Sequence, residues 1–232
     1  MGKMIFKINT NTKMAYLVIA YPNMIAVLER LGIAFGFGDK SLQDIAIQYE
    51  IDTKAFLSIL LVFQGNKEYP LLSKESIKEV IRFLRLSHLH FKEIQIPEIK
   101  DLISLFAESI PQKHAAMIIS FFKGYIEEVS EHFLYEEETV FPYIDSVLRD
   151  MPRLKRYMID DFEAHHTDIE QKLLDLKNIL IKYIPSDINS PYRISILRHL
   201  IQLEEDLQYH SLIENHVLIP SVKEIENTST YV

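Results

Sequence analysis

Apolar residues recur at a spacing close to 3.6 residues along most of this chain, which predicts helices nearly from end to end. The 232 residues include only six glycines and nine prolines, so few positions interrupt the pattern. Leu, Ile, Glu and Lys, which are mostly good helix formers, dominate the long stretches between them. The pattern therefore predicts an all-α protein.

In the first part of the chain the pattern predicts helices over 13–32, 41–49 and 52–63, and a glycine ends the first of them. Ser41 and Asp52 are candidate N-caps, because their side chains can accept hydrogen bonds from the free N–H groups of a first helical turn. The stretch 64–70 breaks the periodicity. We therefore expect a small helical domain at 1–66 and a second domain at 67–232.

In the second domain the pattern predicts four long helices, joined by short breaks at prolines. Pro97 predicts a kink or break in the first helix, and Pro111 suits the start of the second. Pro142 predicts a disturbance of the second helix after Phe141. Four long helices with short connections are typical of an antiparallel four-helix bundle.

Polar residues interrupt the apolar stripe of each long helix at one place. The stripes contain a histidine in every helix and a glutamate four residues later in two of them: His88, His132 with Glu136, His166, and His210 with Glu214. Residues four apart lie on the same helical face. A carboxylate on a buried face is unfavourable unless something pairs with it, and a metal ion is one such partner. Four imidazoles and two carboxylates suit two iron or manganese ions in a bundle core, with both glutamates bridging and an oxo or hydroxo group completing the pair.

Spacing alone is a weak signal. With nine histidines and 33 acidic residues, about one histidine should have an acid at i+4 by chance, and three do. The third pair is His166–Glu170, where Glu170 lies beside the stripe rather than on it. A single pair of this kind is more often a surface contact worth a few tenths of a kcal/mol. His165 competes with His166 for the third helix, and the sequence leaves both open.

Composition narrows the classes of function. The net charge of −8 and the absence of a basic block argue against nucleic acid as a partner. No cysteine is present, which excludes disulfides, thiolate catalysis and cysteine-ligated clusters in this chain. No uncharged apolar run is long enough to span a membrane and no leader peptide is visible, so we expect a cytoplasmic protein without a membrane partner.

The two histidine–glutamate segments read H-x-x-x-E-E-E-x-x-F-P at 132–142 and H-x-x-x-E-x-x-x-x-x-P at 210–220. Together with Ser87–His90 and the pair at 165–166, they resemble the motifs of hemerythrin-like domains. The whole chain most resembles the di-iron proteins that repair damaged iron–sulfur centres, whose bundle follows a short helical domain. The loop at 34–42 resembles the loop of that domain.

The resemblance implies a non-haem di-iron centre held by four histidines and two bridging glutamates: His88, His132, Glu136, His166, His210 and Glu214. Oxygen-carrying hemerythrins use a fifth histidine and an aspartate, for which this chain has no convincing counterpart. Glu128 resembles a glutamate that repair proteins place near the metals. The repair proteins also carry two adjacent cysteines in the N-terminal loop, where this chain has Gly36 and Phe37.

The leading hypothesis is a di-iron protein acting in iron–sulfur cluster repair or in the oxidative and nitrosative stress response. It would bind O2 or NO, and damaged iron–sulfur proteins would be its clients. The alternative is a redox, O2 or NO sensor that acts through partners without repair activity, and a third reading is a structural bundle with a degenerate site. The sequence is compatible with a homodimer and gives no sign of catalytic turnover.

Overall fold

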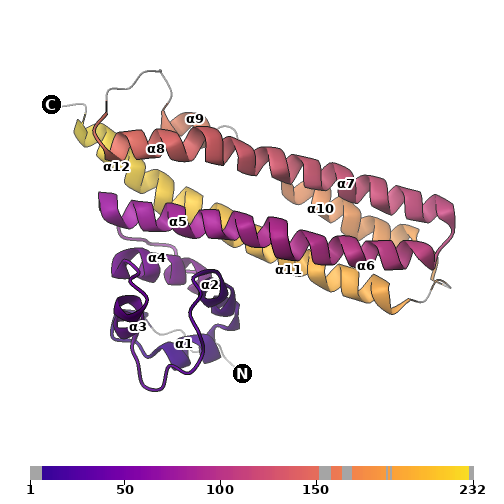
Figure 1. The fold of residues 1–232 in the computed structure, drawn as a ribbon, viewed down its shortest axis with the longest axis horizontal. Helices are drawn as coiled ribbons and strands as arrows, with labels where there is room; N and C mark the ends of the chain where they lie inside the picture. Colours follow the sequence, from indigo (N-terminus) through magenta and orange to yellow (C-terminus); the bar gives the residue numbers. More distant parts are fainter. Residues whose placement is uncertain (1–6, 152–157, 164–168, 187, 189, 230–232) are drawn as a thin grey trace. The chain divides into compact units, whose positions relative to one another are not determined.

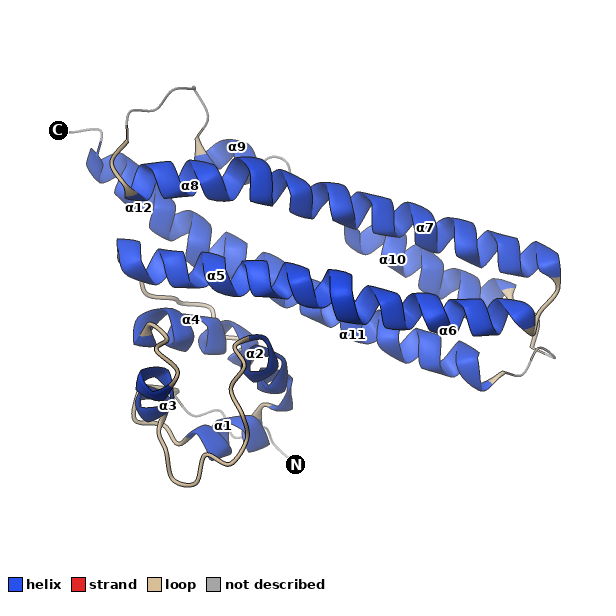
Figure 2. Cartoon of the chain, in the orientation of Figure 1, coloured by secondary structure: helices blue, strands red, loops and turns tan. Residues whose placement is uncertain are grey.

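A computed structural model describes residues 7–151, 158–163, 169–186, 188 and 190–229. Within these ranges the protein is helical and contains no β-strand, apart from an isolated bridge between Lys13 and Ser41 (Figure 2). The all-α bundle that the sequence predicts is confirmed. None of the described helices combines the length and the apolar character needed to cross a membrane.

Backbone proximity divides the chain into two compact units, which are described separately. The first consists of Met1–Ser87, Phe141–Glu163 and Tyr209–Val232, and the second of His88–Val140 and Ala164–Gln208. The expected domain boundary between residues 66 and 67 stays a prediction.

The first unit contains the short N-terminal helices, which are α1 (Met14–Ala20), the 3₁₀ helix η1 (Pro22–Met24), α2 (Ile25–Arg30), α3 (Leu42–Gln48) and α4 (Thr53–Gln64) (Figure 1). The prediction of one helix over 13–32 is wrong. Tyr21 leaves the helical conformation at φ −133° and ψ 79°. The reason is Pro22, which has no N–H to continue the preceding helix and instead starts η1.

Both predicted N-caps are confirmed. The Ser41 hydroxyl accepts a hydrogen bond from the Asp44 N–H, and the Asp44 carboxylate accepts one from the Ser41 N–H, forming a capping box. The Asp52 carboxylate accepts from Ala55 N–H at 2.8 Å. These contacts satisfy N–H groups that the first turn of a helix leaves without backbone partners.

The first unit also contains four helices from later in the chain, namely α5 (Lys74–His90, up to Ser87), α8 (Phe141–Leu148), α9 (Ile159–Glu163) and α12 (Ile219–Ser229). Helix α12 packs against α8 and α9. The Tyr143 hydroxyl donates to the Glu226 carboxylate, and the Ser221 hydroxyl accepts from Leu72 N–H at 3.1 Å. These contacts connect segments that are far apart in the sequence.

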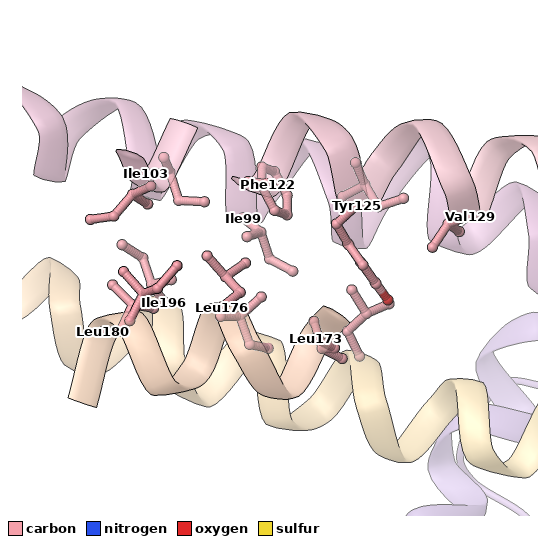
Figure 3. Close-up of a cluster of buried hydrophobic side chains, with 14 of the residues drawn as sticks. Ile99, Ile103, Phe122, Tyr125, Val129, Leu173, Leu176, Leu180 and Ile196 are labelled. Atoms are coloured by element: carbon pink, nitrogen blue, oxygen red, sulfur yellow. The ribbon is translucent and has the colours of Figure 1, made fainter. Parts of the chain in front are cut away.

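The second unit is built from α6 (Ile96–Glu108), α7 (Gln112–Tyr135), α10 (Ile169–Asn178) and α11 (Pro191–Ile213, up to Gln208). Its four helices share one apolar core, part of which Figure 3 shows. The core includes Ile99 and Ile103 from α6, Phe122 and Val129 from α7, Leu173, Leu176 and Leu180 from α10, and Ile196, Leu200 and Leu203 from α11. These are the residues that the 3.6-residue stripes bring to one face of each helix.

Four π-helical segments among the described residues lie at one fixed distance before a proline. They are η2 (Phe91–Gln95), η3 (Glu136–Val140), η4 (Ile179–Tyr183) and η5 (Glu214–Leu218), and each ends two residues before a proline. Segments η2, η3 and η5 continue into another α-helix, whereas η4 ends its helix at Ile184. Proline removes an N–H and clashes with the carbonyl four residues earlier, and a widened turn relieves both problems. At Pro97 the sequence predicts a kink or a break, and the break is wrong, because η2 lets the helix continue into α6. The disturbance near Pro142 falls before Phe141 rather than after it.

Candidate metal centre

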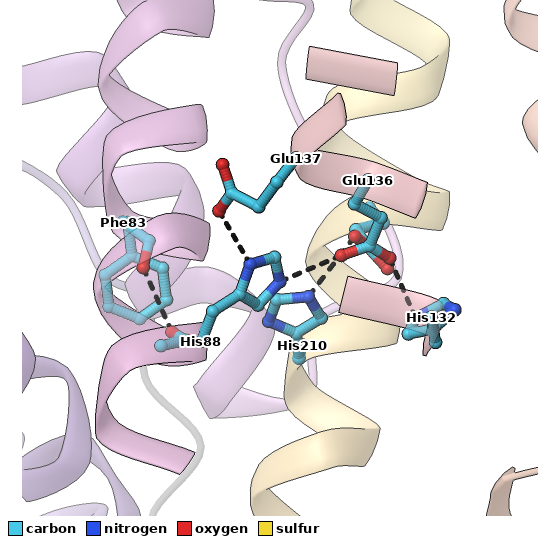
Figure 4. Close-up of polar contacts among 8 residues, drawn as sticks. Phe83, His88, His132, Glu136, Glu137 and His210 are labelled. Atoms are coloured by element: carbon cyan, nitrogen blue, oxygen red, sulfur yellow. Dashed lines mark hydrogen bonds and ion pairs between the residues drawn. The ribbon is translucent and has the colours of Figure 1, made fainter. Parts of the chain in front are cut away.

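Glu136 is a fully buried carboxylate of the candidate site (Figure 4). It is the first residue of η3 and its side chain is 0% exposed. His132 Nε2 lies 2.8 Å from Glu136 Oε1, and His88 Nε2 lies 2.8 Å from Glu136 Oε2. The two oxygens of one buried carboxylate thus each face an imidazole nitrogen from a different helix.

His88 has a second carboxylate on its other side. Its Nδ1 lies 2.9 Å from Glu137 Oε1, and its ring stacks on Phe133 with centroids 4.2 Å apart. A carboxylate at Nδ1 favours the tautomer that carries its proton there, which leaves the Nε2 lone pair available to a metal. Glu137 therefore orients His88 towards Glu136.

His210 and Glu214 form the second histidine–glutamate pair. His210 Nε2 lies 3.3 Å from Glu214 Oε1, and their side chains are 2% and 0% exposed. His210 belongs to the last turn of α11, and Glu214 begins η5. The two glutamates of the motifs thus occupy the same position, the first residue of a π-helical segment, and both are completely buried.

Local sequence explains this shared position. Each glutamate lies six residues before a proline, Pro142 or Pro220, and the π segment fills the interval up to two residues before that proline. A π-helical turn is wider than an α-helical turn and changes the direction in which its side chains point. Such segments are frequent at functional sites. The motif therefore specifies a backbone feature as well as the spacing of its polar residues.

The motif residues divide between the two units: His88, His132 and Glu136 belong to the second, and His210 and Glu214 to the first. Within the second unit His88 and His132 flank Glu136, and within the first unit His210 lies beside Glu214. A buried carboxylate in each unit is unfavourable without compensating positive charge. Imidazole nitrogens and carboxylate oxygens also suit iron and manganese. The donors present therefore fit a metal centre.

Some candidate residues of the sequence analysis are not found at the site. His166 and its competitor His165 lie outside the described residues, as does the side chain of Glu170. Glu128 forms an ion pair with Lys172 and its side chain is 39% exposed. It therefore contacts a lysine of α10 near the surface.

Histidines outside the motifs have their own contacts. The His199 imidazole lies 2.7 Å from the Ser195 carbonyl oxygen within the same helix, and the His216 ring stacks on Tyr69. Neither histidine belongs to the two histidine–glutamate motifs. The sequence analysis missed Glu137, although the run of three glutamates at 136–138 offered the signal that an acid beside a ligand can reach a neighbouring helix.

The sequence profile of the hemerythrin HHE cation-binding domain matches residues 79–220, which is more than half of the chain. The matched segment begins in α5, ends at Pro220 and includes both histidine–glutamate motifs. No curated protein matches the chain.

Proposed function

Because the chain belongs to the hemerythrin HHE cation-binding domain family, we propose that it is a non-haem di-iron protein. The ligands would be His88, His132, Glu136, His166, His210 and Glu214. One observation carries the proposal: Glu136 is fully buried, and each of its oxygens lies 2.8 Å from the Nε2 of a different histidine. A bridging carboxylate needs a metal and a supporting imidazole on each side, and this arrangement supplies both imidazoles.

Iron is the proposed metal, with an oxo or hydroxo bridge, and manganese is the competing one. Oxygen and imidazole donors accept either ion, so the choice depends on loading as well as on geometry. When bound to these residues, an iron pair would supply reversible redox chemistry and a binding site for O2 or NO. The chain's own contribution is to hold the donors and to exclude water through burial of both glutamates.

For the physiological role, we propose repair of damaged iron–sulfur proteins or protection against oxidative and nitrosative stress. The support is the family membership together with a small helical region preceding the bundle. The chain has no cysteine, so thiol chemistry cannot contribute to this role. Any repair activity would depend on the iron pair alone.

A specific contact favours a second candidate, a sensor without repair activity. Tyr209, which directly precedes His210, stacks on Phe63 of α4 with ring centroids 4.2 Å apart. Its hydroxyl accepts a hydrogen bond from Asn23 Nδ2 at 2.7 Å. The N-terminal helices therefore contact the residue beside a proposed ligand, and a change at that ligand could reach a partner through them.

Metal analysis of purified protein after iron reconstitution tests the proposed centre. We expect about two iron ions per chain from the bridged-pair chemistry, and their loss in His132→Ala and Glu214→Ala. His199→Ala is the matched control, because His199 lies on α11 like His210 but bonds a backbone carbonyl. A folded protein that stays metal-free after reconstitution would contradict the proposal.

The two roles are separated by giving the iron-loaded protein a damaged iron–sulfur enzyme. Recovery of that enzyme's activity supports repair and counts against the sensor. No recovery, together with partner binding that changes on oxidation and loses this change in Asn23→Ala, supports the sensor.

A further inference from the structure

The first helices of the chain expose an apolar surface. Between Met14 and Leu28, a segment that spans α1, η1 and most of α2, no residue carries a charge. Four side chains of this segment are exposed, and all four are aromatic or aliphatic: Tyr16, Ile19, Pro22 and Ile25. We call these four residues the N-terminal apolar patch. Its two most exposed members, Ile19 and Tyr16, are 77% and 68% exposed.

Helix α1 is apolar on both of its faces. Met14 and Leu17 are 0% exposed and form the inner face. Tyr16 and Ile19 lie three residues apart on the opposite face. A helix at the surface of a soluble protein normally has polar residues on its outer side. The outer side of α1 therefore has the composition of a buried face.

The other polar side chains of the segment make contacts within the protein. Asn23, which has the only side-chain amide of the segment, donates a hydrogen bond to the Tyr209 hydroxyl at 2.7 Å. The Tyr21 hydroxyl accepts one from Gln64 Nε2 at 3.0 Å. The patch itself offers a partner apolar surface and one hydroxyl, that of Tyr16.

Exposed apolar residues elsewhere stand beside charged ones. Ile194 on α11 is 54% exposed, and Arg198 follows it by one helical turn. Ile201, on the same helix, has Arg198 three residues before it and Glu205 four residues after it. Single exposed apolar side chains are normal in soluble proteins, whereas an uncharged group of them marks an interaction surface. The N-terminal apolar patch is of the second kind.

We propose that the N-terminal apolar patch is the surface through which two copies of this chain associate. The chain has a net charge of −8, so two copies repel each other in general. At the patch, identical surfaces can meet without like charges facing each other. A two-fold axis would bring Tyr16 and Ile19 of one copy against the same patch of the other. A charged partner would instead lose hydration there without gaining a counter-charge.

The size of the patch predicts the strength of this association. Stable interfaces bury about 800 Å² on each partner and involve about 20–30 residues a side, which is more than four side chains provide. We therefore expect a reversible dimer that forms as protein concentration rises. None of the four residues is a proposed metal ligand, so the association does not rest on the metal centre.

Sedimentation velocity of the full chain at increasing protein concentration is the first test. The wild type should shift from monomer towards dimer. Ile19→Glu places a charge in the interface and should raise the dissociation constant about tenfold or more. Ile194→Glu is the matched control, because it changes an exposed isoleucine outside the patch, and should associate like the wild type. A wild type that stays monomeric, or a dimer that Ile19→Glu leaves unchanged, would overturn the proposal.

Single-cysteine variants test the position of the interface, because the chain has no cysteine of its own. A short bis-maleimide should link Ile19→Cys into covalent dimers faster than Ile194→Cys. Equal rates would overturn the proposal, because chance collisions would then explain the linking.

Flotation with phosphatidylcholine vesicles tests the competing occupant, a lipid surface. The dimer proposal predicts that the wild type stays unbound. A monomeric wild type that floats with the vesicles, while Ile19→Glu does not, would assign the patch to lipid and overturn the proposal.

Discussion

Helix α7 and its extension η3 run through two regions that use the same helical stripe in opposite ways. In the first, Phe122 and Val129 face the apolar core shared with α6, α10 and α11. In the second, His132 and Glu136 occupy the next positions of the stripe and are joined to each other. The apolar region gains stability from burial itself, whereas burial of the polar region has a desolvation cost that a bound cation would offset.

Burial of apolar side chains and burial of carboxylates therefore have opposite effects on the stability of the metal-free protein. The apolar core should be stable with or without metal, because its contacts need nothing further. The buried carboxylates should favour metal binding at the expense of the metal-free fold. Stability and metal content should therefore respond separately to substitution in the two regions.

The largest effect on stability is expected from Phe122→Ala. Removing a buried aromatic ring leaves a cavity, and such changes lower the free energy of unfolding by about 3–5 kcal/mol. Chemical denaturation measures this loss, and the folded fraction should still bind as much iron as the wild type. A large drop in iron per folded chain would show that the two regions are not separable.

Glu214→Ala should give the reverse pattern. Iron binding is lost, while the metal-free variant should be at least as stable as metal-free wild type, because one buried carboxylate no longer loses its hydration. Denaturation of both metal-free proteins measures the difference. A clear loss of stability in metal-free Glu214→Ala would mean that this glutamate supports the fold without metal.

Glu137→Ala should have a smaller effect, confined to metal affinity. Loss of the carboxylate at His88 Nδ1 removes an orienting contact, and substitutions of this kind typically weaken metal binding about 10- to 100-fold. Competition with a chelator measures the affinity. Glu138→Ala, which changes the exposed neighbouring glutamate, is the control and should bind like wild type.

The smallest effect is expected far from both regions, at the capping box. Ser41→Ala should lower the free energy of unfolding by about 1 kcal/mol without changing iron content. The hydrogen bonds from the Ser41 backbone and side chain hold the pKa of Asp44 below its ordinary value of 3.8. Because the folded pKa is the lower one, the contribution of Asp44 is present above that value and is lost as pH falls through the folded pKa. Comparing Asp44→Asn with wild type across acidic pH checks this sign.

Much of the fold followed from periodicity. The stripes predicted the helices of the bundle, and Ser41 and Asp52 marked helix starts correctly because capping depends on a few adjacent residues. Pro22 was overlooked within an apparently continuous pattern. The break expected as one outcome at Pro97 does not occur, because a π turn accommodates the proline within a continuous helix.

The candidate site was predictable to a similar degree. The placement of His132 and Glu136 on the stripe brought them to a common face, and the structure joins them at 2.8 Å. The contact of Glu137 with His88 was not predictable, because the two residues are 49 positions apart in sequence and lie on different helices. Periodicity shows which face a residue occupies but not which residue of a neighbouring helix it meets.

Mössbauer spectroscopy of protein reconstituted with ⁵⁷Fe tests the central claim most directly. The proposal predicts a single population of two spin-coupled ferric ions per folded chain, with a diamagnetic ground state, and the loss of that signal in Glu136→Ala. Mononuclear, magnetically uncoupled iron in the wild type, or a coupled signal that survives Glu136→Ala, would contradict a centre bridged by this buried carboxylate.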